Sequence, residues 1–286
     1  MSTVEGITRM VNLRPYATLR AGGAAERFAI ATTVDELADL AIHAQTESVD
    51  LTTLGSGSNV LPADAGVAGL VVINSARQIH ISPGGEVEAD CGAAFQDLCI
   101  RSAQFGLAGL EFAVGIPGTI GGALVSNAGA YRSNVSEFLT EIEVVADGER
   151  KWVPPSFMEF AYRDSLLRRP NPPAVVLLRV RMVVPPGDRL KTWNEARDYQ
   201  RQRIGKQPAP ASAGSFFKNV YSIELAESLE TLPQRMKEAG VVPAGYLIEA
   251  AGLKGKRHGG AMMGERHANF MLNVGGATAT SIRSLP

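Results

Sequence analysis

Several features that would place this chain in a specialised class are missing from its sequence. Its 286 residues contain two cysteines, Cys91 and Cys99, which are too few for a disulfide scaffold and have no histidine at metal-ligand spacing. No apolar run approaches the ~20 residues that cross a bilayer, and the N-terminus has no apolar signal segment. The net charge of −1 gives no basic field for nucleic acid or an anionic membrane. We therefore expect a cytoplasmic protein with a small-molecule substrate that binds no metal, no nucleic acid and no membrane.

Two common catalytic motifs are missing as well. No G-x-G-x-x-G sequence opens a helix after the first expected strand, which argues against a Rossmann dinucleotide site. No G-x-S-x-G sequence surrounds Ser215, which argues against a hydrolase nucleophile. What remains is an ordinary composition, with 45% apolar and 20% charged residues, in a chain long enough for two domains or three small ones.

The residue pattern predicts alternating strands and helices in the first part of the chain. Thr33 and Glu36 form a capping-box pattern before an apolar helical face, and 70–73 is typical of a buried strand. Asp147-Gly148 indicates a hairpin, and 174–184 alternates as a half-buried strand does. Residues 1–13 have no clear period and are expected to form a loosely held lead-in.

Pro185-Pro186-Gly187 ends this pattern, and we expect a domain boundary there. A polar, arginine-rich helix follows at 193–204, then a helical region over 222–239 that Pro233 interrupts. Phe270–Asn273 is expected to be a short strand.

Two glycine-rich stretches are the most informative part of the sequence. Residues 115–131 (GIPGTIGGALVSNAGAY) contain five glycines and a proline in 17 positions, and residues 54–61 read LGSGSNVL. Glycine lets backbone amides approach a bulky ligand closely, and successive amides in turns form anion sites. One such stretch is as consistent with a surface turn as with a binding loop, whereas two flanking one domain favour a large phosphate-bearing cofactor.

Further motifs in the same order resemble one family of proteins. Besides the two glycine-rich stretches they are Tyr162-Arg-Asp-Ser165, Ala213-Gly-Ser-Phe-Phe-Lys-Asn219, and 250–255 continuing to 259–261 and 267–270. From about Thr18 to Thr278 the chain resembles UDP-N-acetylenolpyruvoylglucosamine reductase (MurB), a flavoenzyme of peptidoglycan precursor synthesis. No tyrosine-bearing insertion is present in 173–189, which resembles the subgroup without that lid.

The resemblance implies an α+β fold and two cofactors. The expected architecture is an FAD-binding domain of the vanillyl-alcohol-oxidase (PCMH) type in two α/β parts, at 1–70 and 71–186, and a smaller α+β substrate domain at 187–286. FAD would be tightly bound, NADPH would be a transient hydride donor, the substrate would be a UDP-sugar, and the protein would be a monomer or weak oligomer.

The resemblance also implies roles for individual residues. Arg163 matches the family's charge-stabilising arginine and Ser215 its proton donor, while Asp164 and Ser165 would give supporting hydrogen bonds. The expected FAD-binding residues are Gly55, Ser56, Gly57, Ser58, Asn59, Val60, Pro117, Gly118, Thr119, Gly121, Gly122, Ser126, Asn127, Ala128, Gly129 and Tyr131. The expected substrate-binding residues are Lys206, Lys218, Asn219 and His267.

One family feature has no counterpart in this sequence. The third catalytic residue of the family is a glutamate in a C-terminal strand, and this sequence stops at Ser284-Leu-Pro286 without such a segment. Either the given sequence is shortened, or this member is impaired, or another acid replaces the glutamate. Two other functions therefore stay open, a different FAD-dependent oxidoreductase on the same scaffold and a catalytically silent FAD-binding paralogue.

Overall fold

The computed structural model describes residues 6–206, 208 and 210–285, and for Lys206 only the backbone. The chain forms two compact units, which are described separately. The first contains the chain up to Asn12, Ala24–Gly57 and Gly66–Gly205; the second contains Leu13–Gly23, Ser58–Ala65 and the chain from Lys206 onward. This division into two units does not test the three domains expected at 1–70, 71–186 and 187–286, which therefore stay a prediction.

The first unit begins with a four-stranded sheet in the order β1-β2-β4-β3. Its strands are β1 (Thr8–Asn12), β2 (Ala24–Ala31), β3 (Leu51–Leu54) and β4 (Val67–Asn74), with β1 antiparallel and the others parallel. Helix α1 (Val34–Thr46) connects β2 to β3. Its first turn has the predicted capping box, in which Thr33 Oγ1 accepts from the Glu36 amide at 3.1 Å and the Glu36 carboxylate accepts from the Thr33 amide at 3.4 Å.

Strand β1 corrects the expectation of a loosely held lead-in for residues 8–12, while residues 1–5 of that lead-in lie outside the described residues. Residues 8–12 pair with 24–28 along the edge of the sheet. Four of the five β1 residues are exposed. An edge strand with both faces towards solvent needs no apolar alternation, so its sequence carries no strand period.

A second sheet of the first unit is antiparallel and has the order β10-β9-β11-β6-β5. It consists of β5 (Ile79–Ile81), β6 (Glu86–Asp90), β9 (Leu139–Ala146), β10 (Glu149–Val153) and β11 (Val175–Val183). The predicted hairpin at Asp147-Gly148 joins β9 to β10, with φ of 56° and 75° at its two turn residues. This geometry requires positive φ at both positions, which Asp-Gly supplies at low cost.

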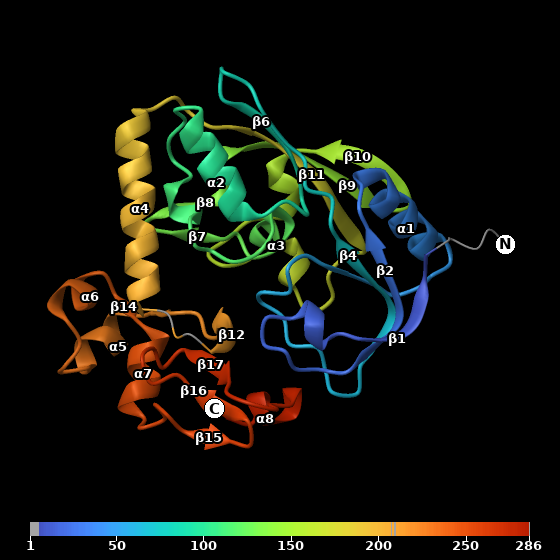
Figure 1. The fold of residues 1–286 in the computed structure, drawn as a ribbon. Coiled ribbons are helices and arrows are strands. Elements are labelled where there is room, and N and C mark those ends of the chain that lie inside the picture. The colour runs from blue at the N-terminus through green and yellow to red at the C-terminus, as the bar shows by residue number, and fades with distance from the viewer. Residues whose placement is uncertain (1–5, 207, 209, 286) are drawn as a thin grey trace. The chain divides into compact units, whose positions relative to one another are not determined.

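Helix α1 shares one apolar core with both sheets. Leu37 and Leu40 of α1 lie in a buried cluster with Leu70 of β4 and with Val176 and Leu178 of β11. A second core on the antiparallel sheet includes residues of α2 (Phe95–Gln104), α3 (Ile120–Val125) and α4 (Arg189–Lys206). Figure 1 shows α4 running beside α2 and the short strands β7 (Gly129–Ala130) and β8 (Ser133–Asn134). Cys99 is buried in this core, as predicted.

The second unit is built on a sheet in the order β12-β17-β16-β15. Its strands are β12 (Ala211–Ser215), β15 (Arg257–His258), β16 (Ala261–Met263) and β17 (Phe270–Asn273). The other elements are α5 (Ile223–Ser228), α6 (Gln234–Glu238), α7 (Ala244–Ala250), α8 (Ala279–Arg283) and the pair β13 (Val220–Tyr221) and β14 (Val241–Val242). The predicted interruption at Pro233 separates α5 from α6.

Candidate functional site

The two glycine-rich stretches meet inside the first unit. Gly55 follows β3, and a Cβ atom added to it would lie 2.2 Å from Thr119 Oγ1 and 2.7 Å from Thr119 Cγ2. Real Cβ atoms do not approach other heavy atoms this closely. Only glycine therefore allows Gly55 and Thr119 to be neighbours, and this contact is consistent with the prediction that the two loops hold one cofactor.

Thr119 is also the N-cap of α3, and the chain around it is hydrogen-bonded to residues 91–95. Its Oγ1 accepts from the Gly122 amide at 3.3 Å. The Gly121 amide donates to Cys91 O at 2.8 Å, and a Cβ on Gly121 would lie 3.1 Å from Cys91 Cβ. Because these bonds occupy the amides of Gly121 and Gly122, neither amide is free to donate to FAD. If these two residues contact FAD, they would do so because glycine lets the backbone come close to the ligand.

Other amides of the two loops have no acceptor in the described part of the chain, among them those of Ser56, Gly118 and Thr119. Thr119 is only 5% exposed, and a buried amide without an acceptor is rare in a folded protein. An anion such as a pyrophosphate would satisfy these donors, so the two glycine-rich loops fit the phosphate part of FAD.

The far end of the second stretch has an unsatisfied acceptor. Asn127 is buried and has a φ of 41°; its Nδ2 donates to Ala161 O at 3.1 Å, while its Oδ1 has no hydrogen-bond partner among the described residues. A buried polar atom without a partner costs roughly 1–3 kcal/mol. Its neighbours Ala128 and Ser126 are bonded inside the protein, to Ala123 O and Gly122 O. A donor on a flavin ring would satisfy Asn127 Oδ1, and the expected ring position at 127–131 fits this site.

The Tyr162–Ser165 loop packs against the same stretch. Arg163 has a φ of 53°, and its Nη2 donates to Gly129 O at 2.5 Å. Ser165 Oγ donates to Val125 O at 2.7 Å. Arg163 forms no ion pair within the described residues, and Asp164 Oδ1 accepts instead from the Ser165 amide. The guanidinium of Arg163 is thus placed beside the expected flavin site without a carboxylate that neutralises it.

Tyr131 is fixed by helix α4. It lies in the two-residue turn of the β7–β8 hairpin, where Tyr131 and Arg132 have φ of 54° and 70°. The Tyr131 ring stacks on that of Tyr199 with centroids 3.7 Å apart and planes 8° apart, and its hydroxyl donates to Gln202 Oε1 at 3.3 Å. Turns of this type prefer Gly, Asn or Asp, so the contacts with α4 must offset backbone strain.

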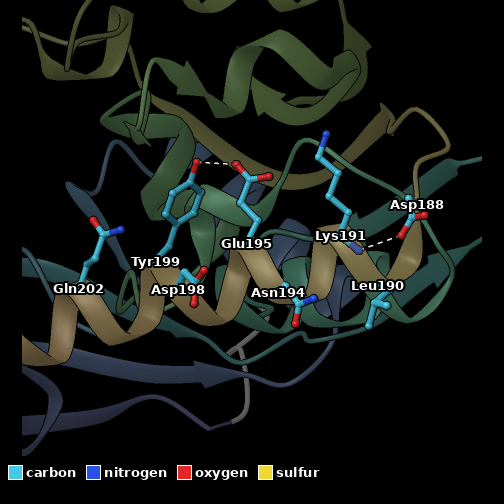
Figure 2. Close-up of a pocket in the computed structure, with 8 residues that line it drawn as sticks. All are labelled: Asp188, Leu190, Lys191, Asn194, Glu195, Asp198, Tyr199 and Gln202. Carbon is cyan, nitrogen blue, oxygen red and sulfur yellow. Dashed lines mark hydrogen bonds between the residues drawn. The ribbon is translucent and has the colours of Figure 1, made fainter.

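Figure 2 shows the α4 face that contains Tyr199 and Gln202. The Tyr199 hydroxyl donates to Glu195 Oε1 at 2.6 Å, and this hydrogen bond raises the pKa of Tyr199 to about 12. A shallow surface hollow follows the helix, lined by Asp188, Leu190, Lys191, Asn194, Glu195, Asp198, Tyr199 and Gln202. It contains none of the expected site residues.

Within the second unit, Ser215 lies at the end of β12 after an irregularity. The register shifts between Ser212 and Ser215, with Gly214 at φ +77°, and Ser215 then faces Phe270 of β17. The chain beyond it is held by Asn269. Asn269 O accepts from the Phe216 amide at 3.0 Å, and its carboxamide makes two 2.9 Å bonds to the amide and carbonyl of Phe217. Asn269 lies in the 267–270 motif, but its sequence context predicts no role for it.

The expected substrate-binding residues have different surroundings. Asn219 Oδ1 accepts from the Ala244 amide at 3.2 Å, at the start of α7. His267 Nδ1 accepts from the Asn269 amide at 3.3 Å, and its ring lies against Phe270. Lys218 is exposed. The Lys206 side chain lies outside the described part of the structure.

Three of the expected FAD-binding residues, Ser58, Asn59 and Val60, belong to the second unit. The segment that they begin is tied to the C-terminal part of the chain by Asp64. Its carboxylate accepts from the amides of Ala279 and Thr280, both at 2.8 Å, and from Thr280 Oγ1 at 2.7 Å. These bonds lower the pKa of Asp64, so the link is kept at neutral pH.

Two family models match the chain. Residues 25–153 match "FAD binding domain", and residues 206–286 match "UDP-N-acetylenolpyruvoylglucosamine reductase, C-terminal domain". The first match covers both glycine-rich stretches. By fold and cofactor domain the chain is an FAD-dependent oxidoreductase of α+β architecture, which confirms the predicted fold class.

Whole-chain comparisons identify the family. The chain is 36% identical over 278 residues to UDP-N-acetylenolpyruvoylglucosamine reductase of Synechococcus sp. (strain JA-3-3Ab), with 96% of this chain and 82% of the relative covered. It is 38% identical to that of Acaryochloris marina, with 96% and 84% covered. The crystal structure of UDP-N-acetylenolpyruvylglucosamine reductase (MurB) from Thermus caldophilus superposes with a TM-score of 0.78 at 32% identity, covering 97% of this chain and 92% of that one. The chain belongs to the UDP-N-acetylenolpyruvoylglucosamine reductase family, as its motifs predicted.

Proposed function

We propose that this protein reduces the enolpyruvyl group of UDP-N-acetylglucosamine enolpyruvate to UDP-N-acetylmuramate, in peptidoglycan precursor synthesis. The names of its relatives support this substrate, and the FAD binding domain supports the cofactor. The observation that carries the proposal is the position of Arg163, whose guanidinium contacts Gly129 O two residues after Asn127, whose buried Oδ1 has no partner among the described residues. A cation at this point suits a reaction that develops negative charge next to a flavin.

The two glycine-rich loops would hold FAD, with its pyrophosphate at the amides of Ser56, Gly118 and Thr119 and its ring near Asn127–Tyr131. When bound and reduced by NADPH, FAD would supply the hydride for the enolpyruvyl double bond. Asn127 would orient the ring through its Oδ1, and the Tyr131 hairpin, held by Tyr199, would close one side of the site.

Arg163 and Ser215 would act on the substrate. Hydride addition at the methylene carbon moves negative charge into the adjacent carboxylate, which an always-charged guanidinium can stabilise by donating two parallel hydrogen bonds. Ser215 would then donate a proton to the α-carbon. A hydroxyl is a weak acid near neutral pH, so this step needs the strongly basic carbon that charge development creates. Lys206, Lys218, Asn219 and His267 would bind the UDP-sugar.

The proposal also covers the localisation, oligomeric state and domain organisation of the enzyme. None of the described helices is long and apolar enough to span a bilayer. We propose a cytoplasmic monomer or weak oligomer that uses NADPH, binds no nucleic acid and has the domains 1–70, 71–186 and 187–286.

Anaerobic spectrophotometry in two stages tests the function. NADPH should bleach the oxidised-flavin absorbance, and the enolpyruvyl sugar should then restore it without oxygen. A protein whose reduced flavin responds to oxygen and another substrate, but not to this sugar, would be a different oxidoreductase. A protein whose flavin NADPH does not reduce would contradict catalysis of this reaction and favour the silent paralogue.

A further inference from the structure

Arg203 of α4 is a half-buried cation for which the described residues provide no anion. Its Nη2 donates to Phe112 O at 3.0 Å, while its Nε is buried without a hydrogen-bond partner. No carboxylate pairs with it in the part of the chain that the structure describes. Burying a charge without a counter-charge is costly, so this arrangement is stable only if something else offsets the cost.

Arg203 reaches the same hairpin as Arg163. Its stem crosses Gly115, where an added Cβ would lie 3.0 Å from Arg203 Cδ, and its Cζ lies 5.8 Å from the Tyr131 ring centroid. Arg163 contacts the hairpin two residues earlier, at Gly129 O. Burial and the charge of Arg163 together lower the pKa of Arg203. Two guanidinium groups therefore converge on residues 129–131, and neither forms an ion pair with a carboxylate among the described residues.

The backbone around this pair is strained. Asn127, Tyr131, Arg132 and Arg163 all have φ between 41° and 70°, although none is glycine. Backbone strain of this kind is concentrated where ligands are bound. Like charges held close together on a strained hairpin are stabilised when an anion binds between them.

We propose that Arg203, together with Arg163, binds the carboxylate of the enolpyruvyl group and selects carboxylate-bearing sugars over neutral ones. This inference rests on the proposed function and adds a specificity-determining residue to it. Phosphate, from the diphosphate of NADPH, is the other anion that a guanidinium would bind. The carboxylate is favoured because Arg203 shares its hairpin with the arginine that the reaction itself requires at that group.

A ligand pair that differs only in the enolpyruvyl group tests the inference by binding alone. The oxidised flavoprotein is titrated with UDP-N-acetylglucosamine enolpyruvate and with UDP-N-acetylglucosamine, and the flavin absorbance change gives each Kd. Arg203→Met, which keeps the packing of the stem, should weaken the enolpyruvyl sugar roughly 10- to 100-fold and the neutral sugar by less than about 3-fold. Arg203→Lys, which keeps the charge but loses the planar fork, should show a smaller loss in the same direction.

Arg201→Met is the matched control. Arg201 lies on the same helix, is exposed and pairs only with the exposed Asp198 among the described residues, so its removal should change neither Kd. The FAD content of each variant shows whether its fold is intact. If Arg203→Met loses FAD, the Kd values of the two sugars for Arg203→Lys test the inference.

Four results would overturn the inference while leaving the proposed function intact. They are unchanged discrimination in both Arg203 variants, equal loss of both sugars, the same loss in Arg201→Met, and a rise in the KM of NADPH without a change for the sugar. Wild-type protein that binds neither sugar would contradict the proposed function, and this inference with it.

Discussion

Replacing Gly55 with alanine should prevent the two glycine-rich loops from meeting. The new Cβ would lie 2.2 Å from Thr119 Oγ1, more than 1 Å inside the 3.4 Å at which ordinary contacts begin. Thr119 cannot turn away freely, because its hydroxyl caps α3 and the chain on either side of it is bonded to residues 93 and 95. Overpacking of this kind costs typically 1–3 kcal/mol, and here it would also displace unsatisfied amides expected to bind phosphate.

The assay measures FAD stoichiometry after purification and the midpoint of thermal unfolding. Gly55→Ala should lose most of its FAD and unfold several degrees lower, since about 1 kcal/mol corresponds to roughly 2–4 °C in a chain of this size. Thr119→Ala alone should cost about 1 kcal/mol through the lost cap. Thr119→Ala also removes Oγ1 and Cγ2, the two atoms that the Cβ at residue 55 would meet at 2.2 and 2.7 Å. The double variant Gly55→Ala/Thr119→Ala should therefore be more stable than the sum of the two single effects predicts, by at least ~0.5 kcal/mol.

A matched change controls for the loss of a flexible glycine. Gly148→Ala lies in the β9–β10 turn, where an added Cβ meets no atom within 4 Å, although φ there is +75°. It should lower the unfolding temperature without changing FAD content. Full FAD occupancy in Gly55→Ala, or strictly additive effects in the double variant, would refute the reasoning that the two loops form one cofactor site.

Three further predictions concern other parts of the molecule. Ser215→Ala should leave reduction by NADPH intact and slow only the second half-reaction; in stopped-flow, equal slowing of both stages would show that Ser215 is not the proton donor. Glu143→Gln should destabilise the first unit by roughly 1–3 kcal/mol, because Arg150 and Arg179 each donate to its buried carboxylate at 2.7 Å. Although burial opposes it, these bonds lower the pKa of Glu143 below 4.5, so its contribution is complete above about pH 4.5 and is lost as the pH falls through the lowered value. Urea unfolding of wild type and Glu143→Gln should therefore converge in acid, and a constant difference would contradict the assignment. Burial raises the pKa of Cys99 to about 12 and raises that of Cys91 as well, so neither thiol should react with a thiol reagent until the protein unfolds.

Local signals in the sequence were sufficient where neighbouring residues determine the structure. The Thr33–Glu36 capping box, the Asp147-Gly148 turn and the break at Pro233 each depend on chemistry within four residues, and each is present as predicted. Strand β11 was predictable because its buried and exposed residues alternate along one strand.

Features that depend on distant partners were not predictable in this way. Asn269 holds Phe217 across 52 residues, and Tyr131 stacks on Tyr199 from a helix expected in another domain. The β7–β8 turn consists of Tyr131-Arg132, which lacks the Gly or Asn that identifies such turns in a sequence. Arg203 was one of several arginines in a polar helix, and only its burial distinguishes it from Arg201.

The most direct test of the account is to identify the product of one anaerobic turnover. Purified protein reconstituted with FAD is reduced with NADPH, mixed with UDP-N-acetylglucosamine enolpyruvate, and the sugar is analysed by mass spectrometry. The account predicts conversion to UDP-N-acetylmuramate, heavier than the substrate by two hydrogen atoms, in an amount equal to the reduced flavin. Unchanged substrate beside fully reduced flavin would contradict it.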